Sequence, residues 1–303
     1  MKLQDLHVLM AVVQAGSMGK AALILNTTQP NVSRAIGDLE HTLGVRLLDR
    51  HQRGVEPTEC GRALLNCGTA VFDDLRQGVR HIECLADPSA GEVRIGSTAF
   101  LAASFVSALI DRLSRRYPRI AFHLVTGYIE PLHQELSERK VDLLIVRSPG
   151  PHPDERLDFE FLFDDRYVVA AGAKNPWARR RKIQISDLAR ERWVLPPPES
   201  VIGSIIAETF RASGLDYPRA TVVTDSPHTR VSLLETGRFI TVFPASALRL
   251  LTRGAALKVL PVELPMARRP NGIVTLRDRA LSPVAQLFID SAREFAKPMA
   301  KRK

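Results

Sequence analysis

Residues 17–44 read SMGKAALILNTTQPNVSRAIGDLEHTLG, and the apolar spacing of this stretch predicts two helices joined by a short turn. The first helix is expected from about Met18 to Leu25. The second is expected to start after Thr28, whose hydroxyl can cap it, and to stop at Gly44. Its apolar side chains follow one stripe, made of Val32, Ile36, Leu39 and Leu43. Two helices joined in this way, the second opening with exposed polar side chains, are typical of a helix-turn-helix that binds DNA.

The flanking residues extend this motif on both sides. A preceding helix is expected to stop at Gly16, and Ser17 can cap the helix that follows. After the second helix of the motif, two short strands are expected at residues 45–48 and 55–58, around a basic hairpin. This hairpin would be a wing, so the N-terminal part is predicted to be a winged helix-turn-helix domain.

The polar side chains that open the second helix are the candidate base contacts. Arginine pairs with guanine, and glutamine or asparagine with adenine, through two hydrogen bonds in the major groove. The arginines of the wing would meet phosphates, and a helix N-terminus also favours an anion. The alternatives are a solvated helix face, a basic surface loop and simple helix capping. The candidate DNA-binding residues are Ser17, Thr28, Gln29, Pro30, Asn31, Ser33, Arg34, Arg50 and Arg53.

A long helix is expected after the wing. Residues 58–86 contain no proline, and a helix of that length would be on the order of 43 Å long. Apolar or small side chains recur in it every three or four positions, at Leu64, Cys67, Val71, Leu75, Gly78, Ile82 and Leu85. Helices of this kind seldom stand alone, so the stripe predicts a dimerisation helix. The following residues 87–91, DPSAG, are expected to form a hinge.

The pattern changes after residue 91 to short apolar runs that alternate with amphipathic segments. Strands are expected at residues 93–95, 121–125, 143–146, 167–171, 193–195, 220–223, 240–242, 257–260 and 271–276. Helices are expected at residues 104–117, 131–140, 202–213 and 229–236. Such alternation predicts an α/β domain with mostly parallel sheets.

Parallel sheets bind ligands beyond the carboxyl ends of their strands, so the polar residues there are the candidate ligand contacts. Ser97 and Thr98 end the first expected strand and could hold a carboxylate or a sugar, or could cap the next helix. Arg147 follows another strand, where a guanidinium favours an anionic or polyhydroxylated ligand; a surface salt bridge is the alternative. The candidate effector-binding residues are Ser97, Thr98, Gly127, Tyr128, Arg147, Ser148, Ser200, Ser226 and Thr229.

Composition and charge limit the classes of function. The chain has 303 residues, which is longer than one usual domain. Its net charge is +9, yet residues 1–60 hold six basic and six acidic side chains, so charge alone does not locate a DNA site. Its three cysteines lack a C-x-x-C pair, its eight histidines lack metal-ligand spacing, and no catalytic motif or P-loop lysine occurs. The sequence shows no signal peptide and no apolar stretch of about 20 residues, so we expect a cytoplasmic protein that contacts no membrane. We also expect it to hold no metal and no cofactor.

The first 61 residues resemble the LysR-type transcriptional regulators at many fixed positions. These positions are Leu9, Val13, Gly16, Ser17, Ala21, Ala22, Leu25, Gln29, Pro30, Val32, Ser33, Ile36, Leu39, Glu40, Leu43, Gly44, Leu47, Arg50, Thr58 and Gly61. One departure is Leu48, where the family usually has phenylalanine, and Gly19 should slightly weaken its helix. The resemblance implies an all-α winged-helix N-terminal domain, a long linker helix, and a two-lobed α/β domain similar to periplasmic binding proteins.

The resemblance also implies a division of the chain. The expected limits are 1–58 for the DNA-binding domain, 59–87 for the linker helix and 91–303 for the effector-binding domain. Lobe I is expected at about 91–163 plus 271–298 and lobe II at about 166–265, with the crossovers near residues 163–166 and 265–271.

The implied function is a sequence-specific transcription regulator, not an enzyme, that responds to a small-molecule co-inducer of unknown identity. Its implied partners are double-stranded operator DNA and further copies of the chain, in a homodimer or a homotetramer, and RNA polymerase is a further candidate. One alternative is a solute-binding module, which the helix-turn-helix and the missing signal peptide disfavour. The other is an enzyme with an attached DNA-binding domain, for which no catalytic constellation is found.

Overall fold

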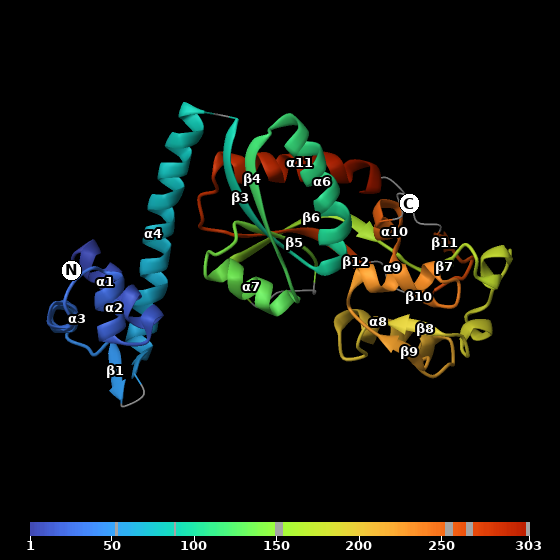
Figure 1. The fold of residues 1–303 in the computed structure, drawn as a ribbon, viewed down its shortest axis with the longest axis horizontal. Helices are drawn as coiled ribbons and strands as arrows, with labels where there is room; N and C mark the ends of the chain where they lie inside the picture. The colour runs from blue at the N-terminus through green and yellow to red at the C-terminus, as the bar shows by residue number, and fades with distance from the viewer. Residues whose placement is uncertain (52–53, 88, 149–153, 252–256, 265–268, 301–303) are drawn as a thin grey trace. The chain divides into compact units, whose positions relative to one another are not determined.

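The computed structural model describes residues 1–303 except 52–53, 88, 149–153, 252–256, 265–268 and 301–303. The chain divides into two compact units, Met1–Arg80 and His81–Lys303, and Figure 1 labels most of their helices and strands.

Three helices and a hairpin open the N-terminal unit. They are α1 at Leu3–Ala15, α2 at Met18–Ile24, α3 at Gln29–Leu43, β1 at Leu48–His51 and β2 at Gly54–Pro57. Gly16 and Gly44 adopt left-handed φ angles of 68° and 69° and end α1 and α3, as expected from the sequence. The Ser17 hydroxyl caps α2 by accepting the Lys20 N–H at 3.1 Å. Among the described helices, none alone is long and apolar enough to cross a membrane, and α1 and α2 pass that test only together, across a bend of 117°.

The hairpin starts later than its sequence suggests. β1 begins at Leu48, not at residue 45, because other groups satisfy the backbone before it. Glu40 Oε1 accepts the N–H groups of Leu47 and Leu48 at 2.8 and 3.2 Å. The Thr58 hydroxyl donates to the Arg46 carbonyl at 2.8 Å. Ahead of the strand, these contacts to a helix side chain and to the start of the next helix therefore engage the Arg46 carbonyl and the Leu47 N–H.

Helix α4 spans Glu59–Ala86, where the sequence predicts a long helix. Its first part packs on the N-terminal core through Leu64 and Leu65. Gly68 lets Leu6 approach so closely that an added Cβ would lie 2.9 Å from the leucine. Further along, four apolar side chains are 53–73% exposed, and we call them the α4 stripe: Leu75, Val79, Ile82 and Leu85. Their spacing of three or four residues places them on one side of the helix.

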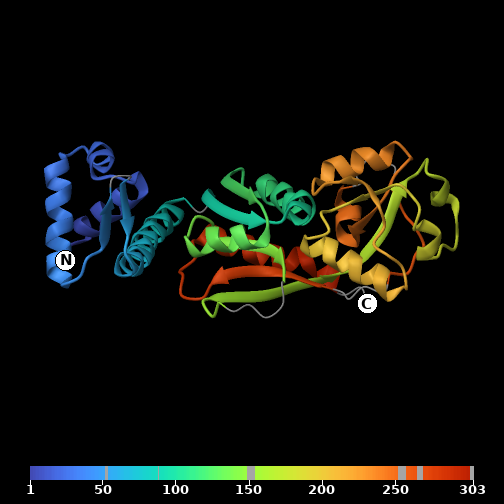
Figure 2. The same cartoon turned by 90° about the horizontal axis from the view of Figure 1, so that it is seen from below.

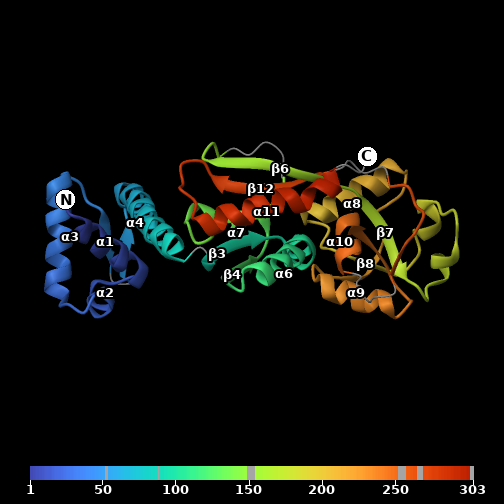
Figure 3. The same cartoon turned by 90° about the horizontal axis from the view of Figure 1, so that it is seen from above.

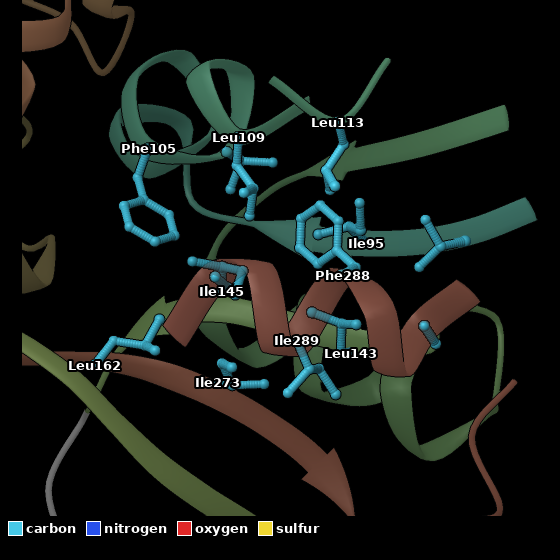
Figure 4. Packing of buried hydrophobic residues seen from close by; sticks show 14 of the residues in the cluster. Ile95, Phe105, Leu109, Leu113, Leu143, Ile145, Leu162, Ile273, Phe288 and Ile289 are labelled. Atoms are coloured by element: carbon cyan, nitrogen blue, oxygen red, sulfur yellow. The ribbon is translucent and has the colours of Figure 1, made fainter. Parts of the chain in front are cut away.

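Lobe I of the C-terminal unit is a five-stranded sheet in the order β4-β3-β5-β12-β6. Its strands are β3 at Ala90–Ser97, β4 at Arg119–Thr126, β5 at Leu143–Arg147, β6 at Leu157–Asp165 and β12 at Arg269–Leu276. Its helices are α5 at Ala99–Leu101, a π-helical turn at Ala102–Val106, α6 at Ser107–Arg116, α7 at Ile129–Ser137 and α11 at Pro283–Ala300. Helices α6 and α11 cover one face of the sheet and α7 the other (Figure 1). Phe288 of α11 packs with Ile95 and Leu113 in the larger of the two cores (Figure 4).

Lobe II is a second five-stranded sheet in the order β11-β7-β10-β8-β9. Its strands are β7 at Tyr167–Gly172, β8 at Trp193–Leu195, β9 at Ala220–Val223, β10 at Ile240–Pro244 and β11 at Leu257–Val259. Its helices are α8 at Val201–Ala212, α9 at Pro227–Glu235 and α10 at Ala245–Leu251, with 3-10 turns at Pro176–Arg179 and Ile185–Leu188. The α8 face holds Trp193 and Phe210, and the opposite face holds Leu234 of α9 and Leu248 of α10.

The sheets are mixed, which corrects the expectation that they are mostly parallel. The pairs β3–β4, β3–β5, β8–β9 and β8–β10 are parallel, and the pairs β5–β12, β6–β12, β7–β10 and β7–β11 are antiparallel. Every antiparallel pair includes β7 or β12, and each of these two strands comes directly after a segment of the other lobe, not after a crossover helix within its own sheet.

Two strands carry the chain between the lobes. β6 ends at Asp165, next to the expected first crossover, and β12 pairs with it from Arg269 onward. β6 and β12 run side by side as long strands (Figures 2 and 3). Of the second expected crossover, residues 265–268 lie outside the described part of the chain.

Candidate nucleic-acid interface and ligand cleft

The exposed side of α3 carries the polar side chains that the sequence singles out. Val32, Ile36 and Leu39 are at most 1% exposed and fix the opposite side of the helix in the core. The helical period then turns other residues outward: Gln29, Pro30, Asn31 and Arg34 are exposed, Thr28 before them is exposed, and Ser33 is half-buried. Thr28 occupies the N-cap position of α3, but its hydroxyl makes no capping hydrogen bond, which corrects that expectation.

One contact joins the hairpin to α3. Nη1 of Arg50, on β1, lies 3.5 Å from Oγ of Ser33, on α3. A cation of the hairpin and the polar side of the helix therefore belong to one surface. Ser17 is half-buried, and its hydroxyl is engaged in the α2 cap. Arg53 lies outside the described residues.

A cavity of about 310 Å³ in the C-terminal unit is lined by residues of both lobes. That volume is at the lower end of the range of roughly 300 to 1,000 Å³ that is usual for ligand pockets. Five of the sequence-predicted candidates line it: Thr98, Gly127, Tyr128, Arg147 and Ser200. The chain brings them together because strand ends and helix starts of the two lobes meet there.

The other four candidates are not among the residues that line this cavity: Ser97, Ser148, Ser226 and Thr229. Ser97 is fully buried, and its hydroxyl donates to the Ile145 carbonyl at 2.7 Å. The Ser226 hydroxyl accepts the Thr229 N–H at 3.2 Å and so caps α9. These two hydroxyls hold the local backbone in place.

Arg147 ends β5 and is 8% exposed. Its Cζ lies 4.7 Å from the centroid of the Tyr167 ring, so the guanidinium stacks on the first residue of β7 in lobe II. Asp165 lies nearby and is held by the backbone N–H of Ser246, at 3.2 Å, and by its hydroxyl. Burial raises the pKa of Asp165, while the bonds from Ser246 and the charge of Arg147 oppose that rise.

Arg230, which the sequence reasoning missed, is fully buried in α9 and lines the same cavity. Its Nε and Nη2 donate to the Thr224 carbonyl at 3.0 and 2.8 Å. Burial lowers the pKa of Arg230 to about 10, and the nearby Asp225 carboxylate opposes that change. The side chain is therefore still a cation at neutral pH.

Two further contacts bridge the lobes at the cavity. The Tyr128 hydroxyl of lobe I donates to Asp225 of lobe II, and this bond raises the pKa of Tyr128. The Phe100 ring of lobe I packs edge-to-face on Phe243 of lobe II, with centroids 5.3 Å apart. Phe100, Asp225 and Ser246 also line the cavity and were not predicted from the sequence. Nothing in their local spacing distinguishes them from ordinary core or turn residues.

The cavity holds polar and charged groups but shows no metal-ligand set. Within the described part of the chain, no group of three or more His, Cys, Asp or Glu side chains is arranged to hold a metal ion. What the cavity offers is two buried arginines, two carboxylates, several hydroxyls and apolar walls, which together suit a small organic molecule.

Known families match both units. The domain described as "LysR substrate binding domain" matches residues 86–297, and the one described as "Bacterial regulatory helix-turn-helix protein, lysR family" matches residues 3–62. The HTH-type transcriptional regulator GbpR of Azospirillum brasilense is 26% identical over 97% of this chain and 86% of its own length. The transcriptional dual regulator GltC of Bacillus subtilis is 26% identical over 97% of each chain. These relatives are named as regulators, not as enzymes.

Solved structures share the fold. Full-length OxyR from Pseudomonas aeruginosa superposes with a TM-score of 0.70 at 21% identity, covering 100% of this chain and 99% of that one. Full-length CbnR in a complex with its target DNA superposes with a TM-score of 0.55 at 20% identity, covering 98% of this chain and 100% of that one.

Proposed function

Because this chain belongs to the LysR family of bacterial transcription regulators, we propose that it binds DNA sequence-specifically and that a small molecule between lobes I and II modulates its promoter activity. The observation that carries the proposal is the cavity of about 310 Å³ with walls from both lobes. A ligand that contacts both lobes binds best to one arrangement of them, and that difference in affinity is what a regulatory signal requires.

The proposed DNA-binding surface is the exposed side of α3 together with the hairpin. Gln29, Asn31 and Arg34 would contact base edges, because their side chains are polar and exposed at the start of the helix. Ser33 and Arg50 lie against each other, so that Arg50 would meet the DNA backbone beside the helix. Thr28 and Pro30 would bring the helix N-terminus to a phosphate. Ser17 and Arg53 complete the proposed set.

The proposed effector site is the cavity, with Thr98, Gly127, Tyr128, Arg147 and Ser200 as its sequence-predicted contacts. Ser97, Ser148, Ser226 and Thr229 remain predictions that the cavity lining does not support. The domain limits stay as proposed from the sequence, at 1–58, 59–87 and 91–303, with lobe II at about 166–265.

The proposed oligomer is a homodimer, or a homotetramer made of two dimers, that acts in the cytoplasm. The exposed α4 stripe supports it, because four large apolar side chains on one helix face gain stability when a second helix covers them. The CbnR structure with its target DNA supports operator DNA as the partner, since that protein shares the fold over its whole length. Contact with RNA polymerase is part of the same proposal.

The test uses the purified full-length protein and an operator recovered by repeated selection from random double-stranded DNA. Small metabolites are screened for those that raise the melting temperature, since a ligand that prefers the folded state stabilises it by mass action. Operator affinity is then titrated with and without each stabilising compound. The proposal expects selective DNA binding that such a compound shifts. It fails if selected and random DNA bind equally, or if no stabilising compound changes operator binding.

A further inference from the structure

One nitrogen of the Arg230 side chain has no hydrogen-bond partner although the residue is fully buried. Nε and Nη2 both point at the Thr224 carbonyl, whereas Nη1 is buried and makes no hydrogen bond within the described residues. A guanidinium has five N–H donors in a rigid fork, and its two Nη1 hydrogens remain available. A buried polar donor left unsatisfied costs free energy, so this nitrogen calls for a partner.

Among the described residues, no carboxylate lies within 4.0 Å of this guanidinium to form an ion pair. The Asp225 carboxylate acts on Arg230 by its charge, but it accepts the hydroxyl of Tyr128. The Phe100 ring, with its centroid 5.1 Å from Cζ, offers only its π face. A buried cation without a paired anion is costly, and an anionic ligand would remove that cost.

The rest of the cavity defines the remainder of the ligand. Apolar walls come from both lobes: Phe100, Leu101, Ile129, Ile202, Pro244 and Ala247. Arg147, the second cation of the lining, already interacts with the Asp165 carboxylate. The carboxylates of Glu130 and Asp225 also line the cavity, so a second negative charge on the ligand would meet like charges. The walls therefore favour a ligand with one anionic group and an apolar body.

We propose that the cavity binds an organic monocarboxylate, whose carboxylate accepts hydrogen bonds from Nη1 of Arg230 and whose apolar part lies against Phe100 and Ile202. This inference rests on the proposed function of the cavity as the effector site. It assigns the ligand anchor to lobe II and to a residue that the sequence does not single out.

The experiment compares carboxylates with their neutral amides on the full-length protein. Binding of benzoate, 3-phenylpropanoate, hexanoate and octanoate, and of the four matching amides, is measured by calorimetry at low salt. At least one carboxylate is expected to bind about tenfold or more tightly than its amide, the factor for one charge-assisted hydrogen bond. Arg230→Gln should remove that preference, whereas Arg238→Gln, at an exposed arginine of the same lobe, should keep it. If Arg230→Gln does not fold, the comparison within the wild-type protein decides.

A second pair of variants places the binding site. Ala247→Phe adds a ring inside the cavity and should abolish binding, whereas Ala212→Phe, at an exposed alanine of α8, should not. One contrary result is that the amides bind as tightly as the carboxylates and that Ala247→Phe blocks the binding of both. This result would overturn the carboxylate inference but would leave the cavity as the effector site. Carboxylate binding that survives in Ala247→Phe would overturn both the inference and the proposed site. Failure of all four carboxylates to bind would overturn the inference alone.

Discussion

The Arg230 guanidinium lies over the Phe100 ring, with Cζ 5.1 Å from the ring centroid, and joins α9 of lobe II to α5 of lobe I. Phe100 is 7% exposed and also meets the Phe243 ring edge-to-face. A cation on one side and an aromatic ring on another hold Phe100 in a single position. Phe100 is therefore both a wall of the cavity and a link between the lobes, so its removal affects stability and ligand binding together.

We expect Phe100→Leu to lower the free energy of unfolding by about 1 to 2 kcal/mol, because it loses apolar burial and the contact with the Arg230 cation. Unfolding of the full-length protein in urea measures this loss. The matched control is Phe159→Leu, at a ring that is 40% exposed on β6, and it should change the free energy by less than about 0.5 kcal/mol. Equal losses in the two variants would show that Phe100 is no more important than a half-exposed ring.

The surface of α3 yields a second prediction. Gln29→Ala combined with Arg34→Ala should abolish sequence preference and leave the fold intact, because both side chains are exposed and their base contacts are worth about 1 to 3 kcal/mol each. Fluorescence anisotropy with the selected operator and with random DNA measures the preference. His41→Ala, an exposed change at the other end of α3, should preserve it. Wild-type operator affinity in the double variant would refute the placement of the recognition helix.

Self-association can be tested on the α4 stripe. Leu75→Asp should break the oligomer, because its carboxylate would be buried without a partner in the contact between helices. Light scattering on the purified protein gives the mass. His81→Asp adds the same charge at an exposed position of α4 outside the stripe and should leave the mass unchanged. An unchanged mass in Leu75→Asp would rule out the stripe as the contact.

Asp165 predicts a dependence of stability on pH. Its pKa in the folded protein is raised by burial above the ordinary 3.8, so the folded state binds the proton more tightly than the unfolded state. The contribution of this group is therefore fully present below pH 3.8 and is lost as the pH rises through the raised pKa. In urea unfolding across the acid range, Asp165→Asn should lose this fall in stability, and the surface variant Asp111→Asn should keep it. Identical pH profiles for wild type and Asp165→Asn would contradict the shift.

Local pattern predicts those parts of the fold that neighbouring residues determine. Gly16, Gly44 and the stripe of Val32 and Ile36 define the ends and the buried side of helices through contacts within one turn, and the structure has them as expected. β6 was not predicted, because its buried residues Leu162 and Phe163 sit among exposed acidic and aromatic side chains and give no clear alternation.

The cavity shows where such reasoning stops. Thr98 and Arg147 could be proposed because each follows a strand, a local feature that the sequence displays. Arg230 could not, because its burial depends on Phe100, which lies 130 positions earlier, and on the packing of one lobe against the other. Within the sequence it is one arginine on a short helix, where a solvated position is the usual outcome.

The last prediction concerns the coupling of ligand to DNA. Thr98→Val removes a hydroxyl from the cavity wall, and Arg147→Ala removes the cation that stacks on Tyr167, so both should weaken the response to the effector. Basal operator affinity should hardly change, because the candidate DNA contacts all lie in the separate N-terminal unit. Coupling between two sites is typically worth about 1 to 3 kcal/mol, so losing most of it would change operator affinity under effector by roughly 5- to 150-fold. Operator titrations with and without a stabilising compound measure this for each variant, with Arg238→Gln as the control on the surface of lobe II. If both variants keep the full wild-type response, Thr98 and Arg147 serve the fold alone, and the search for the anchor narrows to Arg230.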